Sequence, residues 1–245
     1  MFAAVDVGNT ATKIALIGSG GEPDIQRFPS REPSYNPIRE LIHTAGPEKA
    51  LICTVNPSFS NTLEKIFTEA GIPVLYADYR NIPLINRYSP PSEVGSDRLV
   101  TSFGVLKKFH KDAVVVDMGT ALTCEVVTGC GEYLGGLIFP GIELLRRSLS
   151  EHTALLPLVE LTGTSFPAVG KNTQEAVAGG IFRGVCGLVR SLVSDIQASY
   201  QDPLTVCVTG NDSETFRHCF PSEWNIVPDI TMYGLLMLER ELTFE

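Results

Sequence analysis

The chain has 245 residues, of which 44% are hydrophobic and 19% charged, and its net charge is −9. This is the composition of a globular protein with enough apolar material for one large or two smaller domains. An acidic chain without a basic stripe does not suit a nucleic-acid surface or an anionic membrane. We therefore expect no nucleic-acid and no membrane partner.

The cysteine pattern and the N-terminal residues bear on the cellular compartment. The six cysteines form no C-x-x-C pair, so we expect reduced, partly buried thiols. The first residues lack the basic start of a signal peptide, and no apolar run approaches the length of a membrane span. The expected location is the cytoplasm.

Hydrophobic periodicity predicts the elements in chain order. The first half is expected to form a β-hairpin, alternating strands and helices, and a helix after a proline-rich stretch at 80–95: 2–18, 36–45, 50–55, 59–70, 73–76 and 97–109. The second half is expected to repeat this order, with a hairpin, a third strand, helices and a further strand: 112–127, 131–139, 141–153, 173–200, 205–210 and 231–241. This predicts an α/β protein with two domains, residues 1–110 and 111–245, each a mixed sheet with flanking helices.

Both predicted hairpins turn on the same short pattern. The apolar strand runs into Asp-x-Gly and a threonine-rich turn, with matches at a constant offset: Asp6, Gly8 and Thr12 against Asp117, Gly119 and Thr123. Glycine lets backbone N–H groups approach an anion, and an Asp at the strand end can hold a hydrated cation near it. One copy is an ordinary polar turn. Two facing copies would grip a nucleoside triphosphate and its Mg²⁺ from two sides.

That arrangement resembles the acetate and sugar kinase/heat-shock protein 70/actin superfamily, whose two ribonuclease H-like domains clamp ATP. Six motifs sharpen the resemblance: Asp6–Thr10, Pro91–Arg98, Asp117–Thr123, Gly135–Gly141, Leu156-Pro157 and Gly170–Thr173. Their order and spacing are similar to those of type III pantothenate kinases, which phosphorylate pantothenate in the first step of coenzyme A synthesis. The resemblance implies ATP, Mg²⁺, a monovalent cation (K⁺ or NH₄⁺), and a homodimer.

The resemblance assigns the nucleotide and metal contacts to the two turns. Asp6 would help to place Mg²⁺, and Asp117 would bind the monovalent cation. Thr120 would contact ATP from the second turn. The first turn would supply backbone, hydroxyl and lysine contacts to ATP through Asp6, Val7, Gly8, Asn9, Thr10, Ala11, Thr12 and Lys13.

The acceptor site is implied by the Gly-Ser-Asp-Arg motif. Asp97 matches the general base of the family; the alternative is that it serves only as an N-cap or first-turn acid of a helix. Arg98 offers a rigid fork of donors to the polar end of pantothenate. Further pantothenate contacts are implied for Tyr88, Gly95, Ser96 and Thr173. The partner subunit would supply this threonine, which could instead simply cap a helix.

Three departures from the family pattern keep other functions open. Ser96 replaces an alanine, a change expected to be tolerated, and Leu122 replaces a threonine. The segment Thr209–Asp212 stands where the family has Thr-Gly-Gly. Asparagine tolerates the left-handed backbone better than other non-glycine residues, but ATP affinity is put in doubt. The alternatives are a kinase of another small alcohol and an ATP-binding protein without kinase activity.

Overall fold

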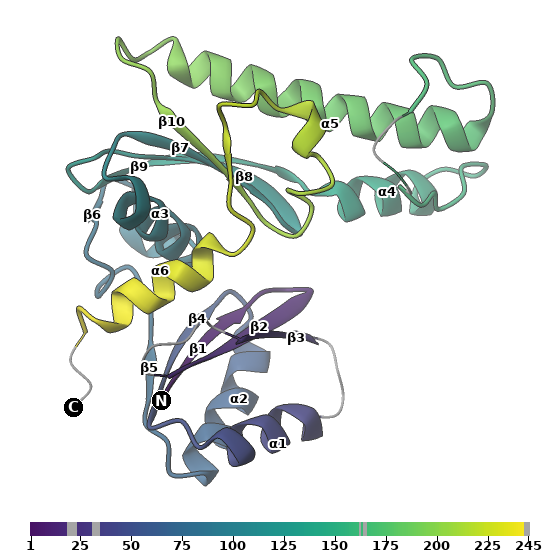
Figure 1. Cartoon of the computed structure of the whole chain (residues 1–245). Helices are drawn as coiled ribbons and strands as arrows, with labels where there is room; N and C mark the ends of the chain where they lie inside the picture. The colour runs from purple at the N-terminus through teal and green to yellow at the C-terminus, as the bar shows by residue number, and fades with distance from the viewer. Residues whose placement is uncertain (19–23, 31–34, 162, 164–165, 243–245) are drawn as a thin grey trace. The chain divides into compact units, whose positions relative to one another are not determined.

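The computed structural model describes residues 1–18, 24–30, 35–161, 163 and 166–242 (Figure 1). The chain divides into two compact units. The first holds Met1–His110, Gly131–Tyr133 and the C-terminal segment that begins at Ile230; the second holds Lys111–Cys130 and Leu134–Asp229.

The first unit is built on a five-stranded sheet of order β3-β2-β1-β4-β5. The strands are β1 (Phe2–Val7), β2 (Ala11–Ile17), β3 (Asp24–Pro29), β4 (Lys49–Thr54) and β5 (Val74–Tyr76). β1 is antiparallel to β2 and parallel to β4. The helices are α1 (Asn36–Ala45), α2 (Pro57–Glu69), α3 (Ser96–Phe109) and α6 (Ile230–Glu239).

Strand β1 is buried on both faces, as expected for a strand at the centre of a sheet. Ala3, Val5 and Val7 pack into the core formed with α1 and α2. Phe2 and Ala4 face the opposite core, which includes residues of α3 and α6. Because side chains alternate along a strand, Asp6 lies on the α3 and α6 face.

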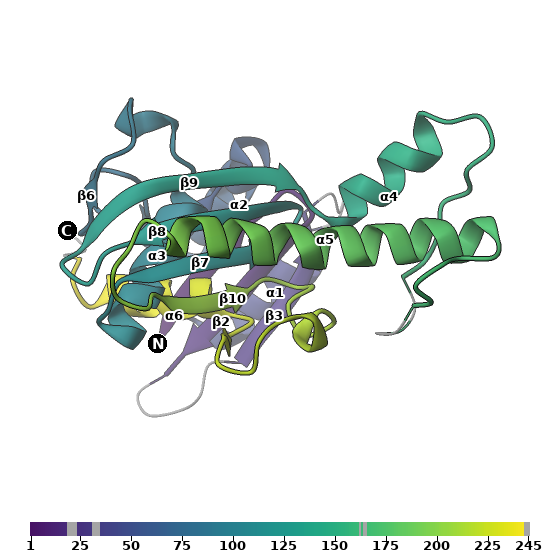
Figure 2. The ribbon, with the colours of Figure 1, turned by 90° about the horizontal axis from the view of Figure 1, so that it is seen from above.

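The second unit contains most of a six-stranded sheet of order β11-β10-β7-β8-β9-β6. Its strands are β7 (Ala113–Met118), β8 (Ala121–Val127), β9 (Glu132–Pro140), β10 (Thr205–Thr209) and β11 (Asn225–Ile226). The last strand of the sheet, β6 (Ile85–Asn86), pairs with Glu132 and Tyr133 at the start of β9, and these four residues belong to the first unit. Helices α4 (Ile142–Glu151) and α5 (Thr173–Gln197) follow β9, and Figure 2 shows α5 running along the sheet. A short 3₁₀ helix, η1 (Pro91–Glu93), belongs to the first unit, and another, η2 (Arg217–Cys219), to the second.

Most of the expected elements are present within one or two residues of their predicted ends. Strands β3, β6 and β11 were not predicted; two of them have only two residues, too few for a periodic pattern. The last helix was expected in the second domain, but α6 packs on α3 in the first unit. The hydroxyls of Thr101 and Thr231 join these helices at 2.8 Å, so the C-terminal segment completes the first core.

Two expectations from composition differ from the structure. The described cysteines are not all reduced thiols, and one described helix reaches the length and apolar composition of a membrane span. Cys186 and Cys219 form a disulfide, while the other four cysteines are free; proximity in the fold, not a sequence motif, brings this pair together. Among the described residues, α5 is also long and apolar enough to span a membrane. The residues that α5 buries, including Val177, Ile181 and Val185, belong to the second unit's core, which explains its apolar composition.

Candidate active site

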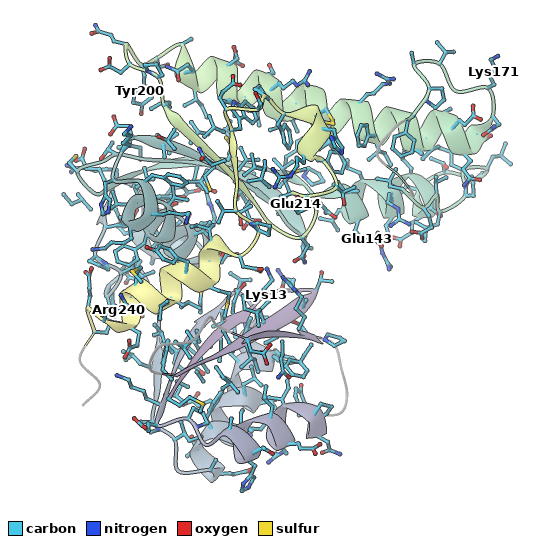
Figure 3. All side chains as sticks on the ribbon, in the orientation of Figure 1. Lys13, Glu143, Lys171, Tyr200, Glu214 and Arg240 are labelled. Carbon is cyan, nitrogen blue, oxygen red and sulfur yellow. A yellow bond between two sulfur atoms is a disulfide. The ribbon has the colours of Figure 1, made fainter. Side chains whose placement is uncertain are left out.

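The first turn presents backbone amides at an exposed hairpin tip. The N–H of Gly8 donates to the carbonyl of Ala11 at 3.1 Å, so Asn9 and Thr10 alone form the exposed connection. A Cβ at Gly8 would lie 3.0 Å from that carbonyl, which leaves little room for a side chain. Lys13 lies on β2 beside the turn (Figure 3), paired in register with Asp6.

The second turn has the same closing hydrogen bond and a tighter connection. The N–H of Gly119 donates to the carbonyl of Ala121 at 3.2 Å, with Thr120 alone between them. Two further glycines pack on this turn. A Cβ at Gly141, the N-cap of α4, would lie 2.2 Å from the carbonyl oxygen of Gly119, and one at Gly210 would lie 2.5 Å from Asp117 Oδ1. The second turn therefore leaves no room for a side chain at positions 141 and 210.

Because the two turns differ in length, one match of the sequence repeat, Thr12 with Thr123, is not a structural match. Thr12 pairs with Val7, whereas Thr123 pairs with Asp117. A shift of one residue sends a side chain to the opposite face of the sheet, so the two threonines are not equivalent. Thr12 is completely buried, and its hydroxyl shares a hydrogen bond of 3.0 Å with Ser30. Lys13, not Thr12, shares the face of Asp6.

Asp97 lies in the first turn of α3, and Gly95 is the N-cap. The Asp97 carboxylate Oδ1 accepts the N–H of Arg98 at 2.8 Å. A Cβ at Gly95 would lie only 2.5 Å from the same oxygen. The missing side chain at Gly95 thus makes room for the carboxylate. Asp97 is not the N-cap, but its expected position in the first turn of the helix is confirmed.

The fold places Asp6 and Asp97 around one buried thiol. Cys53 is completely buried on β4, opposite Asp6 in register. Burial raises the pKa of the Cys53 thiol well above its ordinary value, and the charges of Asp6 and Asp97 raise it further. The predicted metal-placing and base carboxylates therefore lie in the same region of the first unit. Sequence reasoning missed Cys53, because an apolar strand is an ordinary place for cysteine.

Two of the predicted substrate residues contact each other. The Arg98 guanidinium lies over the ring of Tyr88, with its central carbon 5.4 Å from the ring centroid. Arg98 is only 8% exposed, and Tyr88 also lies near Tyr133, at 6.5 Å between centroids. Ring contact limits the orientations of a buried arginine, so the Tyr88 ring orients the Arg98 guanidinium in the first turn of α3.

Asp117, Thr120 and Thr173 belong to the second unit. Thr173 is the first residue of α5, but the cap is Asn172, whose side chain accepts the N–H of Glu175 at 2.9 Å. The capping alternative for Thr173 is therefore wrong. Its exposed side chain lines a groove of about 1180 Å³ between α4 and α5, whose Lys171 end is labelled in Figure 3.

The fold places the chain in one class of α/β proteins, that of the actin-like ATPases and sugar kinases. The solved structures with which the chain shares its fold have the actin-like ATPase and sugar kinase fold. One is a candidate 2-dehydro-3-deoxygalactonokinase from Sinorhizobium meliloti, with a TM-score of 0.60 and 14% identity over 98% of this chain and 99% of that one. Another is component A of the (R)-2-hydroxyglutaryl-CoA dehydratase of Acidaminococcus fermentans, with a TM-score of 0.56 and 15% identity over 96% and 94%.

Sequence comparison identifies the family within that class. The type III pantothenate kinase family model matches residues 2–195. A type III pantothenate kinase of Thermus thermophilus is 33% identical over 98% of this chain and 99% of its own length. One from a Sulfurihydrogenibium species is 31% identical over 90% and 94%. The chain belongs to the type III pantothenate kinase family.

Proposed function

We propose that this protein transfers the γ-phosphoryl group of ATP to the primary hydroxyl of pantothenate in the cytoplasm, the first step of coenzyme A biosynthesis. The observation that carries the proposal is the arrangement on the first unit: Asp97 and Arg98 share one helical turn, and Asp6 lies beside the same buried thiol as Asp97. A base, a substrate-orienting cation and a metal-placing carboxylate are the groups that phosphoryl transfer to an alcohol needs.

Asp97 is the proposed general base. It accepts the proton of the attacking hydroxyl, whose oxygen forms a bond to the γ-phosphorus while the bond from that phosphorus to the bridging oxygen breaks and ADP leaves. The hydrogen bond from the Arg98 amide orients the carboxylate, and the missing side chain at Gly95 leaves room for it. Most of the rate is expected from this positioning.

The two turns are the proposed nucleotide contacts. The backbone amides of Asn9, Thr10 and Thr120 are the proposed donors to phosphate oxygens, since those of Gly8 and Gly119 close the turns. Among the described residues, no three His, Cys, Asp or Glu side chains gather as a protein-only cage. Mg²⁺ is commonly held by one or two carboxylates together with substrate phosphates. Asp6 would hold it, and Asp117 would hold K⁺ or NH₄⁺.

Arg98 and Tyr88 are the proposed contacts to pantothenate. The guanidinium fork matches a carboxylate, and the ring beneath it limits its orientations. Gly95 and Ser96 would line the site through their backbone.

Thr12 is not among the proposed phosphate contacts. Its buried hydroxyl shares a hydrogen bond with Ser30.

A homodimer is the proposed assembly, and a second copy is the proposed occupant of the groove between α4 and α5. The groove is mainly apolar, and small residues of α5, including Gly180, Gly184 and Gly187, line it. Small residues let a second helix approach closely, and exposed apolar patches of this kind mark interfaces. Thr173 lines the same groove, so it would be carried toward the partner's site.

The test is ATP-dependent phosphorylation of pantothenate by the purified protein, with Mg²⁺, in K⁺ and in Na⁺. We expect product in K⁺, much less in Na⁺, and a loss of about 10²-fold in kcat for Asp97→Asn. The matched control is Asp202→Asn, the same chemical change at an exposed loop residue. Turnover with another alcohol alone, or ATP binding without turnover, would replace the proposal by one of the two alternatives.

A further inference from the structure

A serine hydroxyl joins the start of α3 to the end of β4. The Ser96 hydroxyl donates to the carbonyl of Thr54 at 2.9 Å. The Cys53 thiol donates to Ser96 Oγ, with 3.5 Å between the two atoms. The hydroxyl therefore acts as donor and acceptor at once, and both of its partners belong to the last residues of one strand.

The same strand is paired with the strand that carries Asp6. β1 and β4 are parallel, and Asp6 and Cys53 are partners in their register. On the other side, Ser96 directly precedes Asp97 in the first turn of α3. Because the N-cap is a glycine, it has no side chain that could tie this end of the helix to the sheet. The Ser96 hydroxyl forms that connection instead.

We propose that Ser96 is a positioning residue that fixes Asp97 relative to Asp6 through its bonds to Cys53 and Thr54. The inference rests on the proposed function for the roles of the two carboxylates. Without the hydroxyl, the Thr54 carbonyl and the buried Cys53 thiol lose a partner, which allows the first turn of α3 to shift. A small displacement of a reacting group lowers the rate of transfer while leaving substrate binding largely intact. This differs from the sequence expectation that serine is merely tolerated here.

The test begins with Ser96→Ala and a matched control on the same helix. Ser102 is completely buried on α3, and its hydroxyl has no hydrogen-bond partner in the part of the chain that the structure describes. Ser102→Ala removes the same oxygen without removing a bond. We expect Ser96→Ala to lower kcat about tenfold with both KM values within about twofold of the wild type. Ser102→Ala should leave kcat unchanged, and Ser96→Thr, which keeps a hydroxyl, should recover most of the activity.

Two further measurements separate positioning from general destabilisation. In the Asp97→Asn background, the same Ser96→Ala change should cost less than about twofold, because residues that act through one another are not additive. Hydrogen exchange of residues 95–99, which include the Arg98 amide bonded to Asp97, should become about fivefold faster in Ser96→Ala. This second readout requires no kinase activity.

The outcomes distinguish the two proposals. An inactive wild-type protein would refute the proposed function, and the exchange measurement would still decide whether Ser96 holds the turn. Unchanged exchange, an unchanged kcat, an equal loss in Ser102→Ala, or a full additional loss in the Asp97→Asn background would each overturn the positioning role.

Discussion

Replacing Gly141 by alanine is expected to damage the second turn. The new Cβ would lie 2.2 Å from the carbonyl oxygen of Gly119 and 2.4 Å from that of Thr120. Ordinary contacts between such atoms begin near 3.5 Å, so the turn or the start of α4 must move by about 1 Å. Both neighbours are backbone atoms, so a change of side-chain rotamer cannot relieve the overlap. Overpacking of this kind costs about 1–3 kcal/mol.

The expected consequences are a lower melting temperature and weaker use of ATP. For a chain of this size, 1–3 kcal/mol lowers Tm by about 2–12 °C. A shift of about 1 Å at a reacting site can reduce turnover by up to about 10²-fold, so kcat/KM for ATP should fall by at least about tenfold. Thermal unfolding and a coupled assay of ADP release measure both quantities.

An exposed glycine provides the control. A Cβ at the exposed Gly18 would meet no atom within 4 Å, so Gly18→Ala should match the wild type. If Gly141→Ala were destabilised but kept the wild-type kcat/KM for ATP, the assignment of the second turn to the nucleotide would be wrong. If Tm were also unchanged, the close packing of Gly141 on the turn would be wrong as well.

Three further predictions concern pH, helix capping and substrate binding. Burial and the charge of Glu143 raise the pKa of Asp212. A carboxyl whose pKa is higher in the folded than in the unfolded protein destabilises the fold as pH rises above the unfolded pKa. Asp212→Asn should therefore raise Tm at pH 7 and have no such effect near pH 3. Asn172→Ala removes the α5 cap and should cost about 1 kcal/mol of unfolding free energy, whereas an unchanged denaturation midpoint would contradict that role. Arg98→Lys loses the fork over Tyr88 and should raise KM for pantothenate more than KM for ATP; equal changes in initial-rate assays would count against Arg98 as a pantothenate contact.

Local patterns in the sequence were sufficient for most elements and for the family. Strand alternation and helical spacing depend on neighbouring residues, so both hairpins and all the long helices could be predicted. Asp97 could be placed near the start of a helix for the same reason. The motifs of the two turns and of Gly95–Arg98 carried the family resemblance, which the family model confirms over residues 2–195.

The tertiary structure alone decided which distant residues meet. The second turn is one residue shorter than the first, so Thr12 and Thr123 point to different faces relative to their turn aspartates. Thr12 is buried and Thr123 is not. Contact between Cys53 and Ser96, the Arg98–Tyr88 pair and the Cys186–Cys219 disulfide each join segments that no local period relates. The physical reason is that periodicity reports only which face of an element is apolar. Strand register and the packing of helices on sheets then determine which side chains on those faces come together.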